Sequence, residues 1–145
     1  MLERSLIGRE SEPAVHEIEK GQIRRFTEAL GDPNPIYQDE AAARAAGFPS
    51  LVAPPTFATS LTNNERFRHS LDLGTRSILL GEQQIEFSRP IVAGERITVV
   101  TRVADVQERA GASGPSDVLV LEDEGKDEKG ELVFRTRATL ILRRG

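Results

Sequence analysis

A short polar stretch, residues 31–37, holds the side chains best suited to chemistry. It reads Gly31-Asp32-Pro33-Asn34-Pro35-Ile36-Tyr37. The two prolines fix two backbone angles and remove two donors, and residues that precede a proline favour extended conformations. In such a stiff loop, the Asp32 and Asn34 side chains can accept hydrogen bonds from nearby backbone N–H groups. The pattern predicts a rigid loop that holds the Asp32 carboxylate in one place.

Each polar group of this loop also has a simpler explanation. For an isolated Asp-Pro pair, a turn or a helix cap accounts for the aspartate, and Asn34 can serve only to fix the loop. Tyr37 is the only tyrosine. A ring that packs against its neighbours while its hydroxyl group contacts water is a simpler explanation of this residue than proton transfer. His16 and His69 are the only histidines. We expect both of them to be surface or structural residues.

Composition limits the class of protein. The chain has 145 residues, of which 38% are hydrophobic and 29% charged, with a net charge of -4 and no cysteine. These values are typical of a soluble globular protein of one domain, residues 1–145. No basic stripe predicts nucleic-acid binding, and no apolar run has membrane-spanning length. We expect a cytoplasmic protein without a cofactor or a metal site.

The first half of the chain has the pattern of helices. A short strand is predicted at 13–18, followed by an amphipathic helix at 20–30 that Gly31 ends. Asp39 is the expected N-cap of a helix at 40–46, and Gly47 its end. Pro55 suits the first turn of another helix, in which Phe57 and Leu61 share one face. Residues 62–74 are expected to form further helical turns.

The second half alternates with the period of strands. The row Leu79, Gln83, Ile85 and Phe87 predicts a half-buried strand, and a second strand follows from Ile97 with a bulge near Ala104. Residues 111–115 are expected to form a hairpin loop, and residues 118–121 a central strand that is covered on both faces. The acidic run Glu122-Asp123-Glu124 has the pattern of a solvated strand end. The last long strand is expected at 132–142.

Helices followed by antiparallel strands predict an α+β domain whose sheet wraps around one helix. The helix that contains Phe57 is the best candidate for this central element. A single wrapped sheet leaves a long edge strand exposed, and edge-to-edge pairing of two chains would cover it. We therefore expect a dimer.

Three segments together resemble the MaoC-like dehydratases, which include the (R)-specific enoyl-CoA hydratases. They are residues 31–37, residues 47–57 (Gly-Phe-Pro-Ser-Leu-Val-Ala-Pro-Pro-Thr-Phe) and residues 87–95 (Phe-Ser-Arg-Pro-Ile-Val-Ala-Gly-Glu). The Ala-Pro-Pro-Thr-Phe version is most similar to the N-terminal subfamily, which is often the less catalytic half of a two-part enzyme. The resemblance implies the hot-dog fold, an antiparallel sheet wrapped around a central helix.

The resemblance also implies roles for residues. In the family, a loop Asp and His act as acid and base on C2 and C3 of an acyl thioester, while an N–H at the start of the central helix polarises the thioester carbonyl. Asp32 and Asn34 match the motif, but Tyr37 stands where the family has histidine. Asp32 and Tyr37 are thus the candidate catalytic residues. Asn34, Pro55, Thr56 and Phe57 are the candidate substrate-binding residues, with the backbone of Thr56 or Phe57 as the oxyanion donor.

Several functions remain open. The first is a subunit of a 3-hydroxyacyl-thioester dehydratase or enoyl-CoA hydratase that lacks the catalytic histidine and pairs with a second hot-dog chain. The second is a self-sufficient homodimeric hydratase that uses Asp32. A non-enzymatic acyl-CoA-binding module is the third, and a hot-dog thioesterase is a fourth that fold alone does not exclude. In the first three, the small-molecule partner is an acyl-CoA or acyl-carrier-protein thioester.

Overall fold

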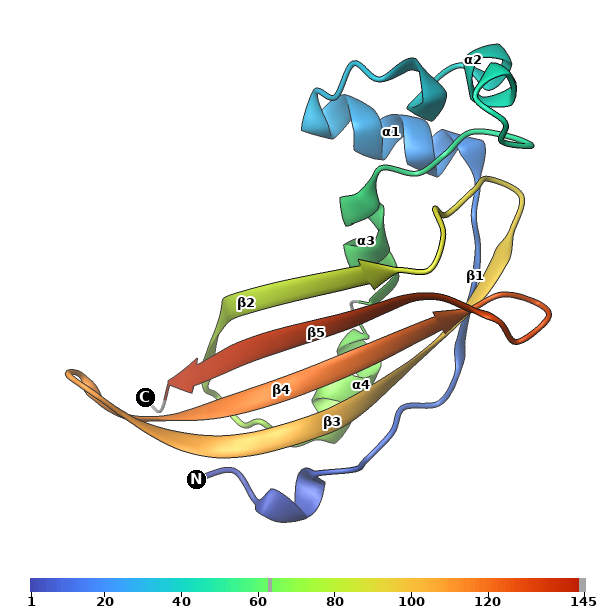
Figure 1. The fold of residues 1–145 in the computed structure, drawn as a ribbon. Helices are drawn as coiled ribbons and strands as arrows, with labels where there is room; N and C mark the ends of the chain where they lie inside the picture. The colour runs from blue at the N-terminus through green and yellow to red at the C-terminus, as the bar shows by residue number, and fades with distance from the viewer. Residues whose placement is uncertain (63, 144–145) are drawn as a thin grey trace.

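The computed structural model describes residues 1–62 and 64–143, and it combines one antiparallel sheet with a set of short helices (Figure 1). The five strands are β1 (Ala14–Glu17), β2 (Ser77–Phe87), β3 (Arg96–Gly111), β4 (Gly114–Lys126) and β5 (Leu132–Arg143). The α-helices are α1 (Lys20–Leu30), α2 (Glu40–Ala45), α3 (Ala58–Thr62) and α4 (Glu65–Ser70), with 3₁₀ turns at Arg4–Leu6, Pro35–Tyr37 and Pro55–Phe57. The sheet order is β1-β3-β4-β5-β2. The predicted α+β class is confirmed.

Strand patterning accounts for the middle of the sheet. β4 is the third strand of five, and Val118, Leu119, Val120 and Leu121 are all buried, which confirms the predicted central strand. The register between β3 and β4 shifts between Val103 and Asp105, where the bulge was predicted. The hairpin that joins β3 to β4 is tighter than expected, because Gly111 pairs with Gly114.

The helices cover one face of the sheet. Figure 1 shows α3 and α4 against that face, with α1 and α2 stacked above α3. Phe57 is only 3% exposed and belongs to a core cluster with Ile23 of α1 and Phe134 of β5. A second cluster joins Phe67 of α4 to Leu119 and Leu142 of the sheet. The helix that contains Phe57 is therefore the central element, as predicted.

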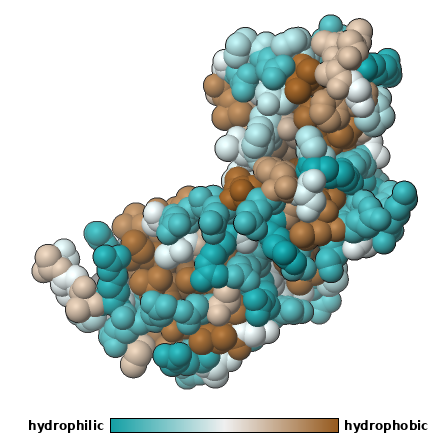
Figure 2. Space-filling model, viewed as in Figure 1, coloured by the Kyte–Doolittle hydropathy of each residue, from teal (hydrophilic) through white to brown (hydrophobic). Residues whose placement is uncertain are grey.

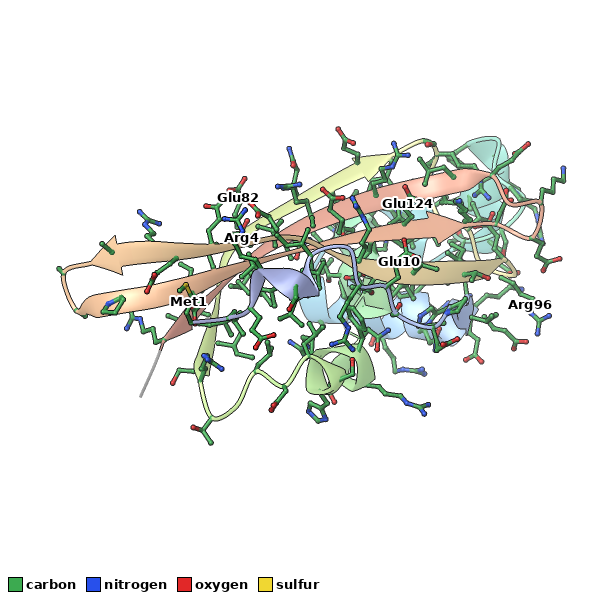
Figure 3. All side chains as sticks on the ribbon, turned by 90° about the horizontal axis from the view of Figure 1, so that it is seen from below. Met1, Arg4, Glu10, Glu82, Arg96 and Glu124 are labelled. Atoms are coloured by element: carbon green, nitrogen blue, oxygen red, sulfur yellow. The ribbon has the colours of Figure 1, made fainter. Side chains whose placement is uncertain are left out.

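The opposite face of the sheet carries many charged side chains beside the buried Val118 and Val120. Seen from below in Figure 3, Glu82 and Glu124 lie on the side of the sheet away from α4. Glu122 on this face forms ion pairs with Arg102 (2.8 Å) and with Arg137 on the neighbouring strands. Cross-strand pairs of this exposed kind contribute little to stability, about 0–1 kcal/mol each. The charges keep this face in water and leave the other face for helices.

The edge strand β2 departs from the predicted pattern. Gln83 and Ile85 are half-buried, but Leu79 and Phe87 are 44% and 36% exposed. A register shift between Leu80 and Glu82 reverses the alternation, so that Leu80, and not Leu79, shares the inner face with Gln83. Figure 2 shows hydrophobic residues near both ends of β2. The expected inward row was thus wrong at its two ends.

Two other predicted segments are shorter in the structure. β1 spans four residues, where six were expected, and its Val15 is 59% exposed. The predicted helical turns of 62–74 are confirmed in α4, and Gly74 follows with a positive φ of 66°. Position 63 of this stretch lies outside the described residues.

Gly125 of β4 offers a test of core packing. A Cβ atom at this position would lie 2.3 Å from the ring of Phe134, which is fully buried. We expect Gly125→Ala to lower the free energy of unfolding by about 1–3 kcal/mol, because the ring must shift within a packed core. Urea unfolding followed by circular dichroism measures this change. The matched control is Gly21→Ala, whose Cβ would meet only the flexible end of Arg25, and a loss of similar size there would contradict the packing explanation.

Candidate active site

The loop after α1 is held by its own side chains. Gly31 has a φ of 69° and ends the helix in the left-handed conformation. Asp32 Oδ1 accepts a hydrogen bond from the Asn34 N–H (3.0 Å), and Asn34 Oδ1 accepts one from the Ile36 N–H (3.3 Å). The predicted stiff loop with local side-chain bonds is confirmed. Asp32 is half-buried, and Asn34 is exposed at the start of the 3₁₀ turn Pro35–Tyr37.

Tyr37 lies within electrostatic reach of Asp32. Partial burial raises the pKa of Tyr37 above its ordinary value of 10.0, and the negative charge of Asp32 raises it further. The phenol is therefore neutral at pH 7 and can donate a hydrogen bond. It is a poor base, because its ionised form is disfavoured by both effects.

Three backbone hydrogen bonds join residues 51–53, which lead into the central helix, to this loop and to residues 91–93. The Val52 N–H donates to the Ile36 carbonyl (3.1 Å), the Ala53 N–H to the Ile91 carbonyl (2.8 Å), and the Ala93 N–H to the Leu51 carbonyl (2.8 Å). The three segments that carry the family resemblance thus lie side by side. Their contact places the Asp32 loop beside the segment that leads into Pro54 and Pro55.

At the start of the central helix, Thr56 is the better oxyanion donor. The Phe57 N–H already donates to the Pro54 carbonyl (2.9 Å). Among the described residues, no acceptor is found for the Thr56 N–H, as is usual in the first turn of a helix. Pro55 and Thr56 are exposed, whereas Phe57 is buried edge-on against Phe26, with ring centroids 5.4 Å apart. Of the two donors considered, only the one at Thr56 is available.

One cavity lies between β1, α1 and α3. It measures about 610 Å³, and its lining includes His16, Arg25, Phe57 and Ser60. Burial lowers the pKa of His16, although a hydrogen bond to the Leu61 carbonyl acts in the opposite direction. His16 is half-buried, whereas His69 is exposed on α4 as expected. The imidazole of His16 is uncharged at pH 7.

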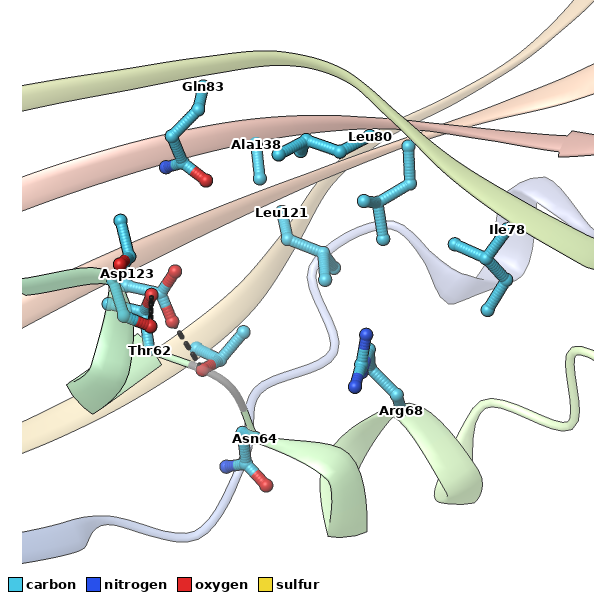
Figure 4. A pocket seen from close by; sticks show the side chains of 12 residues that line it. Thr62, Asn64, Arg68, Ile78, Leu80, Gln83, Leu121, Asp123 and Ala138 are labelled. Atoms are coloured by element: carbon cyan, nitrogen blue, oxygen red, sulfur yellow. Dashed lines mark hydrogen bonds between the residues drawn. The ribbon is translucent and has the colours of Figure 1, made fainter. Parts of the chain in front are cut away.

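A second cavity lies between the helices and the sheet (Figure 4). It measures about 440 Å³, within the range of small-molecule sites. Its lining comes from three elements of the fold: Thr59 and Thr62 of α3, Asn64 and Arg68 at α4, and Ile78, Leu80, Gln83, Thr101, Leu121, Asp123, Ala138 and Leu140 of the sheet. Neither Asp32 nor Tyr37 lines this cavity or the one beside β1.

Asp123 corrects the sequence analysis. It was expected to be solvated with its neighbours, but it is only 3% exposed. Strand alternation places Asp123 on the inner face with Leu119 and Leu121. This alternation could have predicted its burial from the sequence, but the charged neighbours Glu122 and Glu124 made the whole run look solvated. Both carboxyl oxygens are occupied, since Oδ1 accepts from Thr101 Oγ1 (2.5 Å) and Oδ2 from Thr136 Oγ1 (2.8 Å).

The pKa of Asp123 follows from this environment. Burial raises it above the ordinary value of 3.8, and the hydrogen bonds from Thr101 and Thr136 act in the opposite direction.

In the described part of the chain, no three His, Asp or Glu side chains gather as a metal ion would require. None of the described helices is long and apolar enough to cross a membrane.

Comparison with known proteins defines the class. A C-terminally truncated HadBC complex of Mycobacterium tuberculosis, a (3R)-hydroxyacyl-ACP dehydratase, has a chain that is 28% identical, with a TM-score of 0.82 over 94% of this chain and 96% of that one. The ChsH1–ChsH2 complex of the same organism has a chain that is 25% identical, with a TM-score of 0.76 over 91% and 83%. A MaoC-like dehydratase that is 25% identical gives 0.85 over 95% of this chain and 42% of its own longer chain. The fold is the hot-dog fold of these dehydratases.

Sequence comparison gives the family. The description "FAS1-like, dehydratase domain region" matches residues 5–136. A UPF0336 protein of Streptomyces coelicolor is 37% identical over 98% of this chain and 95% of its own, and one of Mycobacterium tuberculosis is 33% identical over 86% and 75%. The chain belongs to the FAS1-like dehydratase-domain family and to the UPF0336 proteins. The resemblance to MaoC-like dehydratases is confirmed.

The buried acid generates a prediction about pH. Because the pKa of Asp123 is raised in the folded state, its contribution to stability is present below pH 3.8 and is lost as the pH rises through the raised value. We expect Asp123→Asn to become more stable relative to the wild type as the pH increases from 4 to 7. Urea unfolding at several pH values measures the difference.

Asp127 supplies the control of opposite sign. Backbone N–H groups, that of Glu131 first, lower its pKa, so its contribution is present above pH 3.8 and is lost as the pH falls. Asp127→Asn should therefore gain stability relative to the wild type as the pH falls below 3.8, and should change little between pH 4 and 7, where Asp123→Asn shows its trend. Parallel trends for the two variants would contradict the assignment of the raised pKa to Asp123.

Proposed function

We propose that this chain is the substrate-cavity subunit of an (R)-specific 3-hydroxyacyl-thioester dehydratase or enoyl-thioester hydratase. In this proposal, residues 1–145 form one hot-dog domain, and a partner hot-dog chain carries the catalytic Asp/His pair. The observation that carries the proposal is Tyr37. It stands at the histidine position of a loop that otherwise keeps the family's motif.

The chemistry explains why this substitution matters. Hydration of an enoyl thioester adds a hydroxyl group at C3 and a proton at C2, and dehydration removes both. An acid–base group works best when its pKa lies near the working pH, and free histidine titrates near 6.5. Tyr37, whose pKa is raised by burial and by Asp32, does not take up a proton from water at pH 7. The acid–base step is therefore assigned to the partner chain.

This chain retains the other part of the machinery. Negative charge develops on the thioester oxygen when a proton leaves or reaches C2, and an N–H directed at that oxygen stabilises it. The unoccupied Thr56 N–H at the start of the central helix is such a donor, and the positive end of the helix dipole adds to its effect. The cavity lined by Thr59 and Thr62, farther along the same helix, is the proposed site of the acyl tail.

The edge strand β2 is the proposed partner surface. Ile78, Leu79, Leu80 and Phe87 are between 36% and 61% exposed on this strand, whose outer edge has no neighbouring strand among the described residues. An exposed apolar edge favours pairing with another strand. The HadBC and ChsH1–ChsH2 structures are complexes of two named components, which supports a second hot-dog chain as the partner.

The retained Asp32 and Asn34 keep a second candidate open, a homodimeric hydratase that uses Asp32 with Tyr37 or water. A non-enzymatic acyl-CoA-binding module is the candidate from another class. It predicts thermal stabilisation by acyl-CoA, which follows from binding to the folded state alone, with no hydration in any pairing.

An activity assay tests the preferred function. The purified chain is assayed on crotonyl-CoA and longer enoyl-CoAs, alone and with a hot-dog partner whose loop has histidine. We expect turnover only with the partner, because this chain lacks the group that moves the proton. Robust turnover by the chain alone would refute the non-catalytic assignment. In that case, a loss of about 10²–10⁴-fold in Asp32→Asn and Tyr37→Phe would establish the homodimeric alternative.

A charged substitution on β2 tests whether this strand forms the contact with the partner chain. We expect Leu79→Lys to weaken association by about tenfold or more, about 1.4 kcal/mol, because the charge would be taken out of water at the interface. Analytical ultracentrifugation measures the dissociation constant. Val15→Lys on β1 makes the same change at the opposite edge, at a residue that is 59% exposed, and it should leave association unchanged. Equal effects of the two variants would exclude β2 as the specific contact.

A further inference from the structure

The cavity between the helices and the sheet has two chemically different ends. Figure 4 shows Asp123, Gln83 and Thr62 at one end and Ile78 and Leu80 at the other. The end with Ile78 and Leu80 offers apolar contacts to a hydrocarbon chain, beside the Arg68 side chain. A cavity meant only for hydrocarbon would gain nothing from a buried carboxyl group, since burying such a group carries a free-energy cost. The polar end therefore requires its own explanation.

Gln83 supplies an independent sign that a polar partner belongs there. Its Nε2 atom is buried and has no hydrogen-bond partner among the described residues. In Figure 4, the amide of Gln83 points toward the end of the cavity where Asp123 lies. A buried donor without an acceptor costs about 1–3 kcal/mol. A ligand oxygen at this point would remove that cost.

We propose that the polar end of this cavity binds a hydroxyl group on the distal part of the acyl tail. This inference rests on the proposed function, which it deepens by naming a class of substrate. Gln83 Nε2 donates to the hydroxyl oxygen, and the Asp123 carboxyl group shares the hydroxyl proton. The Thr101 and Thr136 hydroxyls hold both oxygens of that carboxyl group in place.

The same groups discriminate against charged tails. A second carboxylate beside Asp123 would be repelled or would have to be protonated. An ammonium group would require an ionised Asp123, which burial opposes. A hydroxyl group fits both forms of the acid, because it donates to a carboxylate and accepts from a carboxylic acid.

The length of α3 sets the length of the tail. Thr62 lines the polar end, and it lies about 9 Å along the helix from Thr56, at ~1.5 Å per residue. An extended chain advances roughly 1.2 Å per bond, since a residue of three bonds spans about 3.3–3.6 Å. A thioester carbonyl held at Thr56 therefore places the eighth carbon, approximately, beside Asp123 and Gln83.

The experiment compares two thioesters that differ by one oxygen. Binding of octanoyl-CoA and of 8-hydroxyoctanoyl-CoA to the full chain is measured by calorimetry, in the wild type and in Gln83→Leu and Asp123→Leu. For each protein, the affinity for 8-hydroxyoctanoyl-CoA is divided by the affinity for octanoyl-CoA. We expect this ratio to be at least about tenfold higher in the wild type than in either variant. Gln83→Leu keeps the test valid if Asp123→Leu does not fold, because Gln83 lies on an edge strand.

Glu122→Leu is the matched control. Glu122 is the neighbour of Asp123 on β4 but belongs to the solvent-facing side, where it pairs with Arg102. Its loss should leave the ratio of the two affinities unchanged. If both thioesters bind and their ratio is the same in the wild type and Gln83→Leu, the hydroxyl site is refuted while the proposed function stands. If neither thioester binds the wild type, the proposed function fails, and this inference fails with it.

Discussion

The contact among three backbone segments is the constraint on which the candidate site depends. Val52 and Ala53 donate to the carbonyls of Ile36 and Ile91, while Ala93 donates back to Leu51. All three bonds lie in or beside a buried layer, in which Leu51 is fully covered. Buried backbone groups must be paired, so this arrangement tolerates little displacement. It fixes the Asp32 loop and the start of the central helix relative to each other, although 24 positions separate Asp32 from Thr56 in the sequence.

The short central helix leaves the interior partly hollow. α3 is only five residues long, and the small Ala58 lets its first turn approach the sheet closely. Farther along, Thr59 and Thr62 face Asp123 across a cavity where a longer helix with larger side chains would have packed. A cavity of this size lowers stability, because its lining lacks contacts on one side. It lies between α3, α4 and the sheet, and in the proposed function an acyl tail would restore the missing contacts.

Local sequence signals predicted most of the fold, and tertiary effects account for the failures. Gly31, Asp39 and the Val103–Asp105 bulge were predictable because glycine, capping and alternation act over a few residues. The register shift between Leu80 and Glu82 was missed although Gly81 lies at this point, and a glycine within a strand often marks a bulge. Asp123 was misjudged because its neighbours Glu122 and Glu124 are charged, whereas the Thr101 and Thr136 hydroxyls that make its burial tolerable come from other strands. The residues that meet at the site come from segments far apart in the sequence. A single sequence does not specify how such segments pair.

The loop itself gives a reason why its acidic residue need not be catalytic in this chain. Asp32 and Asn34 each accept a backbone hydrogen bond, so the turn requires both of them whether or not a proton is transferred. The side chain of Tyr37 is not needed to hold the turn, because the 3₁₀ turn that it ends is closed by backbone hydrogen bonds. A chain freed from proton transfer would keep the first two residues and lose the imidazole. This is the pattern observed, and it is the pattern expected of a subunit that retains the shape of the site while another chain performs the acid–base step.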